Sequence, residues 1–203
     1  MLGPWAAGAK SGQRGLLLWA LVLLFSLVAA PAIATADPSA QITEFSSGLN
    51  TGSTPAGMAS GPDGNVWFTD TGTTKAIGRV TLQGVITEFS DGLNTGSSPN
   101  VITLGPDGNV WFTDQGTTGA IGRITPDGRI TEFTSGLNTG SSPQGITVGP
   151  DGNLWFTDQG TTSAIGMVTP QGVITEFSSG LNTGSSPFRM ALGPDGNLWF
   201  TEA

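Results

Sequence analysis

A motif that returns every 44 residues constrains the fold of this chain more than any other feature. Its clearest marker is Trp-Phe-Thr followed by an acid, at Trp67, Trp111, Trp155 and Trp199. In the same register, two further motifs begin at Ile42, Ile86, Ile130 and Ile174 (Ile-Thr-Glu-Phe) and at Gly61, Gly105, Gly149 and Gly193 (Gly-Pro-Asp-Gly-Asn). Repeats of about 40–50 residues that are rich in Gly and strand-forming residues are typical of β-propellers.

Each repeat divides into four short strands. In the third repeat, a short apolar segment at 146–148 and predicted strands at 153–158, 164–169 and 173–177 are separated by turns or loops that contain Gly, two of them with Pro as well. These residues supply the backbone angles that tight turns need, and four strands make one blade. We therefore expect an all-β propeller with blades at about 55–89, 99–133 and 143–177, a partial blade at 187–203, and one strand of a preceding blade at 42–45.

Three full blades and part of a fourth fall short of a ring, which usually needs about four to eight blades. The last predicted strand, at 198–201, would also have an unpaired edge. We therefore expect these blades to belong to a larger ring, completed either by further blades of a longer protein or by self-association.

The first 36 residues predict an export signal. Lys10 and Arg14 precede an apolar run at 16–30 that only one serine interrupts, and the small residues 34–36 follow it. This order is typical of a cleaved signal peptide. An uncleaved membrane anchor is the alternative, although the run is shorter than the roughly 20 residues that span a bilayer. We therefore expect a secreted domain at 37–203.

The composition of the chain limits the classes of molecule that it can bind. It contains no cysteine, so no disulfide stabilises it, and it contains no histidine. Residues 37–203 hold five basic and fifteen acidic side chains, a net charge of −10. Such a charge disfavours nucleic acid and anionic membranes as partners. We expect membrane contact only if the N-terminal segment is retained.

The full repeat joins Gly-Pro-Asp-Gly-Asn-Leu-Trp-Phe-Thr-Asp, Ile-Gly-Arg-Ile-Thr-Pro-Asp-Gly and Ile-Thr-Glu-Phe. Over residues 42–203 this unit resembles the blade of the virginiamycin B lyase family. The resemblance implies a seven-bladed ring that opens cyclic depsipeptide antibiotics of the streptogramin B type. It also implies elimination at the ester linkage with the help of Mg²⁺ and a histidine base.

In the family that the chain resembles, the functional histidines follow the proline that begins an inner strand. Here those positions hold Ala56, Asn100, Gln144 and Phe188. Imidazole is the usual base near neutral pH, so its absence predicts a catalytically incomplete propeller that acts as a binding or scaffold module. The alternative is a metal-dependent carbon–oxygen lyase in which carboxylates replace the histidine.

Two sets of residues are candidates for a site. Side chains that vary within the constant repeat, at the entrance of the inner strands, are Asn100, Gln144, Phe188 and Arg189. They form either a surface for a small molecule or peptide, or a tolerant loop. Acids that end the second strand of each blade are Asp70, Asp114, Asp158 and Glu202. They either ring the channel mouth as ligands for Mg²⁺ or Ca²⁺, or cap their own loops.

Two repeated residues are predicted to be structural. The tryptophan of each repeat is expected to pack between neighbouring blades. The outermost strands carry Glu44, Glu88, Glu132 and Glu176. Because these acids alternate with Ile and Phe, we expect them to face solvent and to protect the sheet edge.

Overall fold

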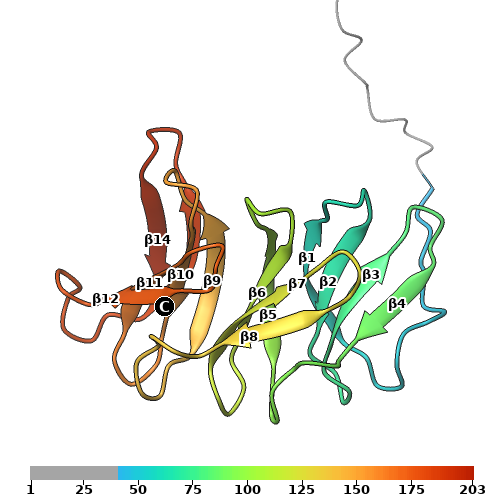
Figure 1. Cartoon of the computed structure of the whole chain (residues 1–203), viewed down its shortest axis with the longest axis horizontal. Coiled ribbons are helices and arrows are strands. Elements are labelled where there is room, and N and C mark those ends of the chain that lie inside the picture. The colour runs from blue at the N-terminus through green and yellow to red at the C-terminus, as the bar shows by residue number, and fades with distance from the viewer. Residues whose placement is uncertain (1–40) are drawn as a thin grey trace, which may run out of the picture. The chain divides into compact units, whose positions relative to one another are not determined.

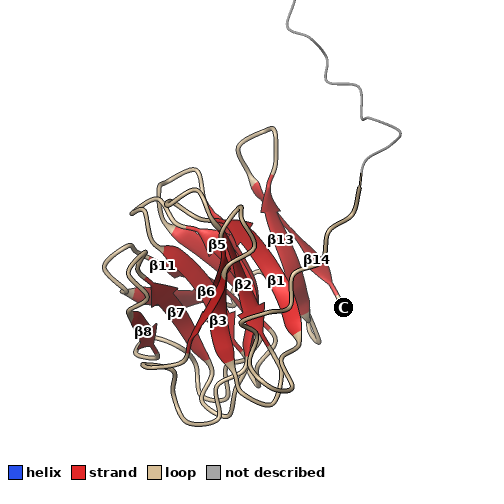
Figure 2. Cartoon of the chain, turned by 90° about the vertical axis from the view of Figure 1, so that its right-hand side faces the viewer, coloured by secondary structure: helices blue, strands red, loops and turns tan. Residues whose placement is uncertain are grey.

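The computed structural model describes residues 41–203, and every regular element in this range is a strand (Figures 1 and 2). Three antiparallel sheets have four strands each, and a fourth sheet has two. The predicted all-β propeller of four-stranded blades is therefore confirmed. The predicted signal segment, residues 1–36, lies outside the described residues. In the described part of the chain, no helix is long and apolar enough to cross a membrane.

The strands follow the chain order within each blade. The first blade contains β1 (Pro55–Ser60), β2 (Val66–Asp70), β3 (Ala76–Val80) and β4 (Ile86–Phe89). The second contains β5 (Pro99–Leu104), β6 (Val110–Asp114), β7 (Ala120–Ile124) and β8 (Ile130–Phe133). The third contains β9 (Pro143–Val148), β10 (Leu154–Asp158), β11 (Ala164–Val168) and β12 (Ile174–Phe177). The two-stranded sheet contains β13 (Pro187–Leu192) and β14 (Leu198–Glu202).

The first strands of successive blades contact one another, so β1, β5, β9 and β13 form the inner edge of the array. These four are called the inner strands below. The fourth strands, β4, β8 and β12, form the outer edge of the blades. The long loops before the inner strands are bound to the loops that follow the second strands, because Thr73 N donates to Gly52 O at 2.9 Å and Thr117 N donates to Gly96 O at 3.1 Å.

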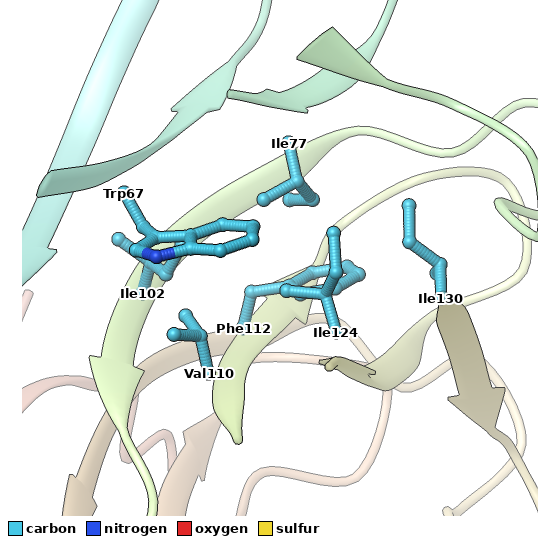
Figure 3. Packing of buried hydrophobic residues seen from close by; sticks show 7 residues of the cluster. All are labelled: Trp67, Ile77, Ile102, Val110, Phe112, Ile124 and Ile130. Atoms are coloured by element: carbon cyan, nitrogen blue, oxygen red, sulfur yellow. The ribbon is translucent and has the colours of Figure 1, made fainter. Parts of the chain in front are cut away.

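The hydrophobic core lies between neighbouring blades. Figure 3 shows the first of these interfaces, between the first and second blades. Trp67 and Ile77 of the first blade pack against five side chains of the second blade, namely Ile102, Val110, Phe112, Ile124 and Ile130. The second interface repeats it with Trp111, Ile121, Ile146, Leu154, Phe156, Val168 and Ile174. Burial of each such side chain stabilises the fold by about 1.5–3 kcal/mol. The predicted packing role of the tryptophans is confirmed at these two interfaces.

Each complete blade also stacks its tryptophan on the phenylalanine of its own outer strand. The ring centroids of Trp67 and Phe89 lie 5.8 Å apart, and the guanidinium carbon of Arg79 lies 5.5 Å from each of them. The indole Nε1 of Trp67 donates to Asp63 Oδ1 at 3.0 Å, within the Gly-Pro-Asp-Gly turn. This turn therefore closes its hairpin and also orients the ring that packs against the next blade.

A threonine hydroxyl connects each blade to the next. Thr113 on β6 accepts a hydrogen bond from Val101 N of its own blade at 3.1 Å and donates to Gln144 O of the third blade at 2.8 Å. Thr69 and Thr157 make the same donation to the following inner strands, both at 2.7 Å. The pairing of β5 with β6 is irregular between Pro99 and Ile102, where Val101 turns its N–H to this hydroxyl instead of the ladder.

The predicted strand at 42–45 is wrong, because the structure has no strand there. An outer strand takes its hydrogen bonds from the third strand of its own blade, and the described residues contain no such strand before it. Phe45 nevertheless occupies the place that the outer-strand phenylalanine of a preceding blade takes in the other repeats. It covers Gly84 as Phe89 covers Gly128, since a Cβ on either glycine would lie 2.1–2.2 Å from the nearest ring atom.

Replacement of Thr113 by valine tests the blade-to-blade bridge. The change keeps the side-chain shape but leaves Val101 N and Gln144 O without their partner, so we expect the free energy of unfolding to fall by about 2 kcal/mol in urea denaturation. Thr201→Val is the matched control, because Thr201 Oγ1 accepts from Arg189 N at 3.1 Å on an exposed strand. Equal losses in the two variants would contradict the role of the bridge.

Candidate functional site

A cavity of 400 Å³ opens between the inner strands. It is lined by Ala56, Gly57, Met58, Asn100, Val101, Ile102 and Arg189, and it is called the inner cavity below. Its residues come from β1, β5 and β13, so the array curves enough for the first and last inner strands to border one space. Two of the predicted ligand-facing residues, Asn100 and Arg189, meet in this cavity.

Arg189 gives the inner cavity its charge. It is the one charged side chain on the four inner strands. Its guanidinium carbon lies 4.4 Å from the centroid of the Phe188 ring, and the residue is exposed. The aromatic face therefore supports the guanidinium, whose N–H groups have no hydrogen-bond partner among residues 41–203 and can bind a ligand.

The structure separates Gln144 from the other predicted ligand-facing residues. Its side chain is 7% exposed and does not line the inner cavity. Gln144 Oε1 accepts from Gln115 Nε2, and Gln144 Nε2 donates to the carbonyl and hydroxyl oxygens of Ser142, each at 3.3 Å. These bonds use the amide within the protein.

Sequence reasoning missed Gly57 and Met58, which line the inner cavity beside Ala56. No polar side chain marks this stretch of β1, so only its equivalence to the variable residues of the other inner strands could have indicated it. The four positions where the resemblance placed histidines are therefore unequal. Asn100 and Ala56 line the cavity, Phe188 supports Arg189, and Gln144 lies outside it.

The aspartates that end the second strands cap their loops. Asp70, Asp114 and Asp158 are fully buried. Asp114 Oδ1 accepts from Ser98 N at 2.5 Å and from Gly116 N at 2.7 Å, and the other two repeat this pattern. Glu202 accepts from Ser186 N at 2.5 Å on the exposed β14.

The same acids do not assemble into a ring. Among residues 41–203, no three Asp, Glu, His or Cys side chains are placed to hold a metal ion together. Each carboxylate stays in its own blade, with one oxygen occupied by two backbone amides in the three aspartates. The donor set therefore does not fit the Mg²⁺ ion that the resemblance implied.

The glutamates of the outer strands do not all face solvent as predicted. Glu132 Oε2 accepts from Asn94 N at 2.7 Å in the long loop, and Glu88 and Glu176 do the same with Asn50 and Asn138. The reason is that the loop before each inner strand folds back over the outer strand and needs acceptors for its amides.

Glu132 and Asp114 form a pair of carboxyl groups inside the second blade. Ser97 Oγ donates to Asp114 Oδ2 at 2.5 Å and lies 3.5 Å from Glu132 Oε1. Burial and the neighbouring Asp114 raise the pKa of Glu132 to about 8. In the third blade, burial and Asp158 raise the pKa of Glu176 to about 7. Two adjacent carboxyl groups cannot both ionise easily, so each pair holds one proton to a higher pH than an ordinary glutamate does.

The comparisons with known proteins agree with this fold. The model of the virginiamycin B lyase family matches residues 20–203, and the chain belongs to this family. A solved streptogramin B lyase is 38% identical, with a TM-score of 0.65, over 73% of this chain and 48% of that one. The chain thus spans about half the length of that enzyme. No curated protein matches the chain.

Other solved structures share the fold at lower identity. A gluconolactonase from Xanthomonas campestris is 20% identical, with a TM-score of 0.56, over 72% of this chain and 55% of its own. A protein of unknown function from Bacteroides caccae is also 20% identical, with a TM-score of 0.51, over 74% of this chain and 53% of its own. These two likenesses concern the fold alone.

The carboxyl pairs predict how stability depends on pH. The ordinary pKa of glutamate is 4.5, so between about pH 5 and pH 8 the folded protein holds protons that the unfolded chain has released. We therefore expect the urea midpoint to fall as the pH rises through this window. The double variant Glu132→Gln, Glu176→Gln should weaken the dependence, because a neutral amide replaces each acid. Glu88, whose pKa burial and the neighbouring Asp70 also raise, keeps its own contribution.

Apart from these three glutamates, other carboxyl groups should not account for the change in stability between pH 5 and pH 8. Carboxyl groups with a lowered pKa, such as Asp107, titrate below the ordinary value of 3.8 and act outside the window. Exposed Glu44→Gln is the matched control and should keep the wild-type slope. A wild-type midpoint that rises between pH 5 and pH 8 would contradict the shared proton.

Proposed function

We propose that this protein is an exported, ligand-binding member of the virginiamycin B lyase family that does not carry out the histidine-dependent elimination of its relatives. The observation that carries the proposal is the inner cavity, in which Asn100 and Arg189 converge at positions of the inner strands. The composition of residues 1–36 supports export.

The residues of the inner cavity favour an acidic ligand of small size. A guanidinium presents a planar fork of donors that matches a carboxylate, and the Asn100 amide can both donate and accept. Met58, Val101 and Ile102 provide apolar walls beside these two groups. The volume of 400 Å³ is typical of a site for a small molecule or the end of a peptide. A carboxylate with an apolar substituent fits this combination.

Catalysis is disfavoured by the groups that the chain lacks near the cavity. It contains no histidine, and no acid lines the inner cavity among the described residues. A proton next to an ester therefore has no base positioned to remove it. The lyase reaction remains the second candidate because the chain is 38% identical to a streptogramin B lyase over 73% of its length.

Incubation with a streptogramin B depsipeptide distinguishes the two candidates. We expect the cyclic compound to be recovered unchanged by liquid chromatography and mass spectrometry, both with Mg²⁺ and after chelation. Ring opening that requires Mg²⁺ and disappears in Asp114→Asn would establish the enzyme and overturn the binding proposal.

Binding is tested with N-acetyl amino acids of increasing apolar side chain, which carry the proposed carboxylate. We expect at least one to bind by isothermal titration, and Arg189→Gln to weaken its affinity by about tenfold or more through loss of a charge-assisted pair. Arg129→Gln is the control, because this exposed arginine precedes β8 and lies outside the inner cavity. Equal affinity in wild type and Arg189→Gln, or no binding by any compound, would refute the site.

A further inference from the structure

The two-stranded sheet exposes the side chains that the other blades bury between them. Trp199 on β14 is 63% exposed, whereas its equivalents Trp67 and Trp111 are fully buried. Phe200 is also exposed on this sheet, whereas its equivalents Phe112 and Phe156 are fully buried. In the two complete interfaces, the tryptophan lies against the apolar face of the next blade. Trp199 has no such face against it in the described residues.

The first blade presents the face that such a tryptophan would contact. An apolar pocket of 240 Å³ is lined by Phe45, Leu49, Pro55, Ala56, Gly57, Met58, Val66, Phe68, Val80 and Ile86. Five of these residues, at 58, 66, 68, 80 and 86, are the repeat equivalents of the residues that receive Trp67 in the second blade. This pocket of the first blade is open, and it is called the socket below. Met58, which lines it, is 73% exposed.

The stacked aromatic pair supplies a second, independent match. Every complete blade stacks the tryptophan of its second strand on the phenylalanine of its outer strand, at 5.6–5.8 Å between centroids. In the part of the chain that the structure describes, Trp199 has no outer-strand phenylalanine of its own sheet to stack on, and Phe45 has no tryptophan from a preceding blade. Phe45 is already seated over Gly84 beside the socket and is 50% exposed.

We propose that two copies of this chain bind head to tail, with the β13–β14 sheet of each copy against the first blade of the other. Trp199 of one copy then fills the socket and stacks on Phe45 of its partner copy. Within one chain, β14 and β4 lie at opposite ends of the array (Figure 1). The inference is argued from the fold and does not need the proposed ligand, although the socket and the inner cavity share Ala56, Gly57 and Met58.

Such a contact is made twice when the two copies are related by a twofold axis. A head-to-tail contact forms a closed assembly when the rotation between copies returns to its start. Two copies bring together eight sheets, twice the four of one chain, and propellers of about four to eight blades are known. The dimer buries both sockets and both Trp199 side chains, whereas the free chain leaves them exposed to water.

Light scattering coupled to size exclusion tests the proposal on the purified full chain. We expect twice the mass of one chain at micromolar concentration. Trp199→Ser and Phe45→Ser should each raise the dimer dissociation constant by about tenfold or more, as central aromatic residues of an interface do. Val173→Ser is the matched control, since this exposed residue lies in the turn before β12, away from both terminal faces. Circular dichroism confirms that each variant retains its sheets.

Mixing the two variants tests the direction of the contact. A pair made of Trp199→Ser and Phe45→Ser retains one undamaged contact, because one copy still has Trp199 and the other still has Phe45. We expect the mixture to dimerise more tightly than either variant alone. A folded monomer of the wild type, an equal effect of Val173→Ser, or a mixture no tighter than its components would overturn the proposal.

Discussion

The threonine bridge is the interaction on which the arrangement of the blades depends. Thr69, Thr113 and Thr157 each donate to a carbonyl of the next inner strand, at 2.7–2.8 Å. Apolar packing of the tryptophan faces stabilises the array but is not directional. The hydroxyl adds a directional bond in a buried place, where an unmatched carbonyl would be costly. It therefore determines where one inner strand lies relative to the next.

This bridge also explains how the inner strands can share a backbone arrangement while their sequences have little more than the first proline in common. On β5, β9 and β13 the residue after the first proline uses its backbone carbonyl for the bridge, so its side chain is free to differ. Asn100 and Arg189 direct polar groups to the cavity, while Gln144 turns back to Gln115 and Ser142. A rigid backbone with variable side chains is a suitable support for ligand binding.

Much of the fold could be predicted from the sequence because the repeat is regular. The predicted strands of the third blade agree with β10, β11 and β12 to within one residue, and β9 begins three residues earlier than expected. The prediction of a strand at 42–45 was wrong because a strand needs a hydrogen-bonding neighbour as well as a suitable local sequence. The prediction that the outer-strand glutamates face solvent was wrong for a related reason. The long loops that fold over these glutamates are distant from them in the sequence, so the local pattern does not indicate the contact.

The sequence by itself determined the blade architecture, the family and the absence of histidine, because each of these follows from local patterns or from composition. Only the tertiary structure decided that Asn100 and Arg189 share a cavity, that Gln144 does not, and that Glu132 holds a proton beside Asp114. The physical reason is that equivalent positions of a repeat have the same local conformation but different neighbours. Burial, charge and hydrogen-bond partners come from those neighbours.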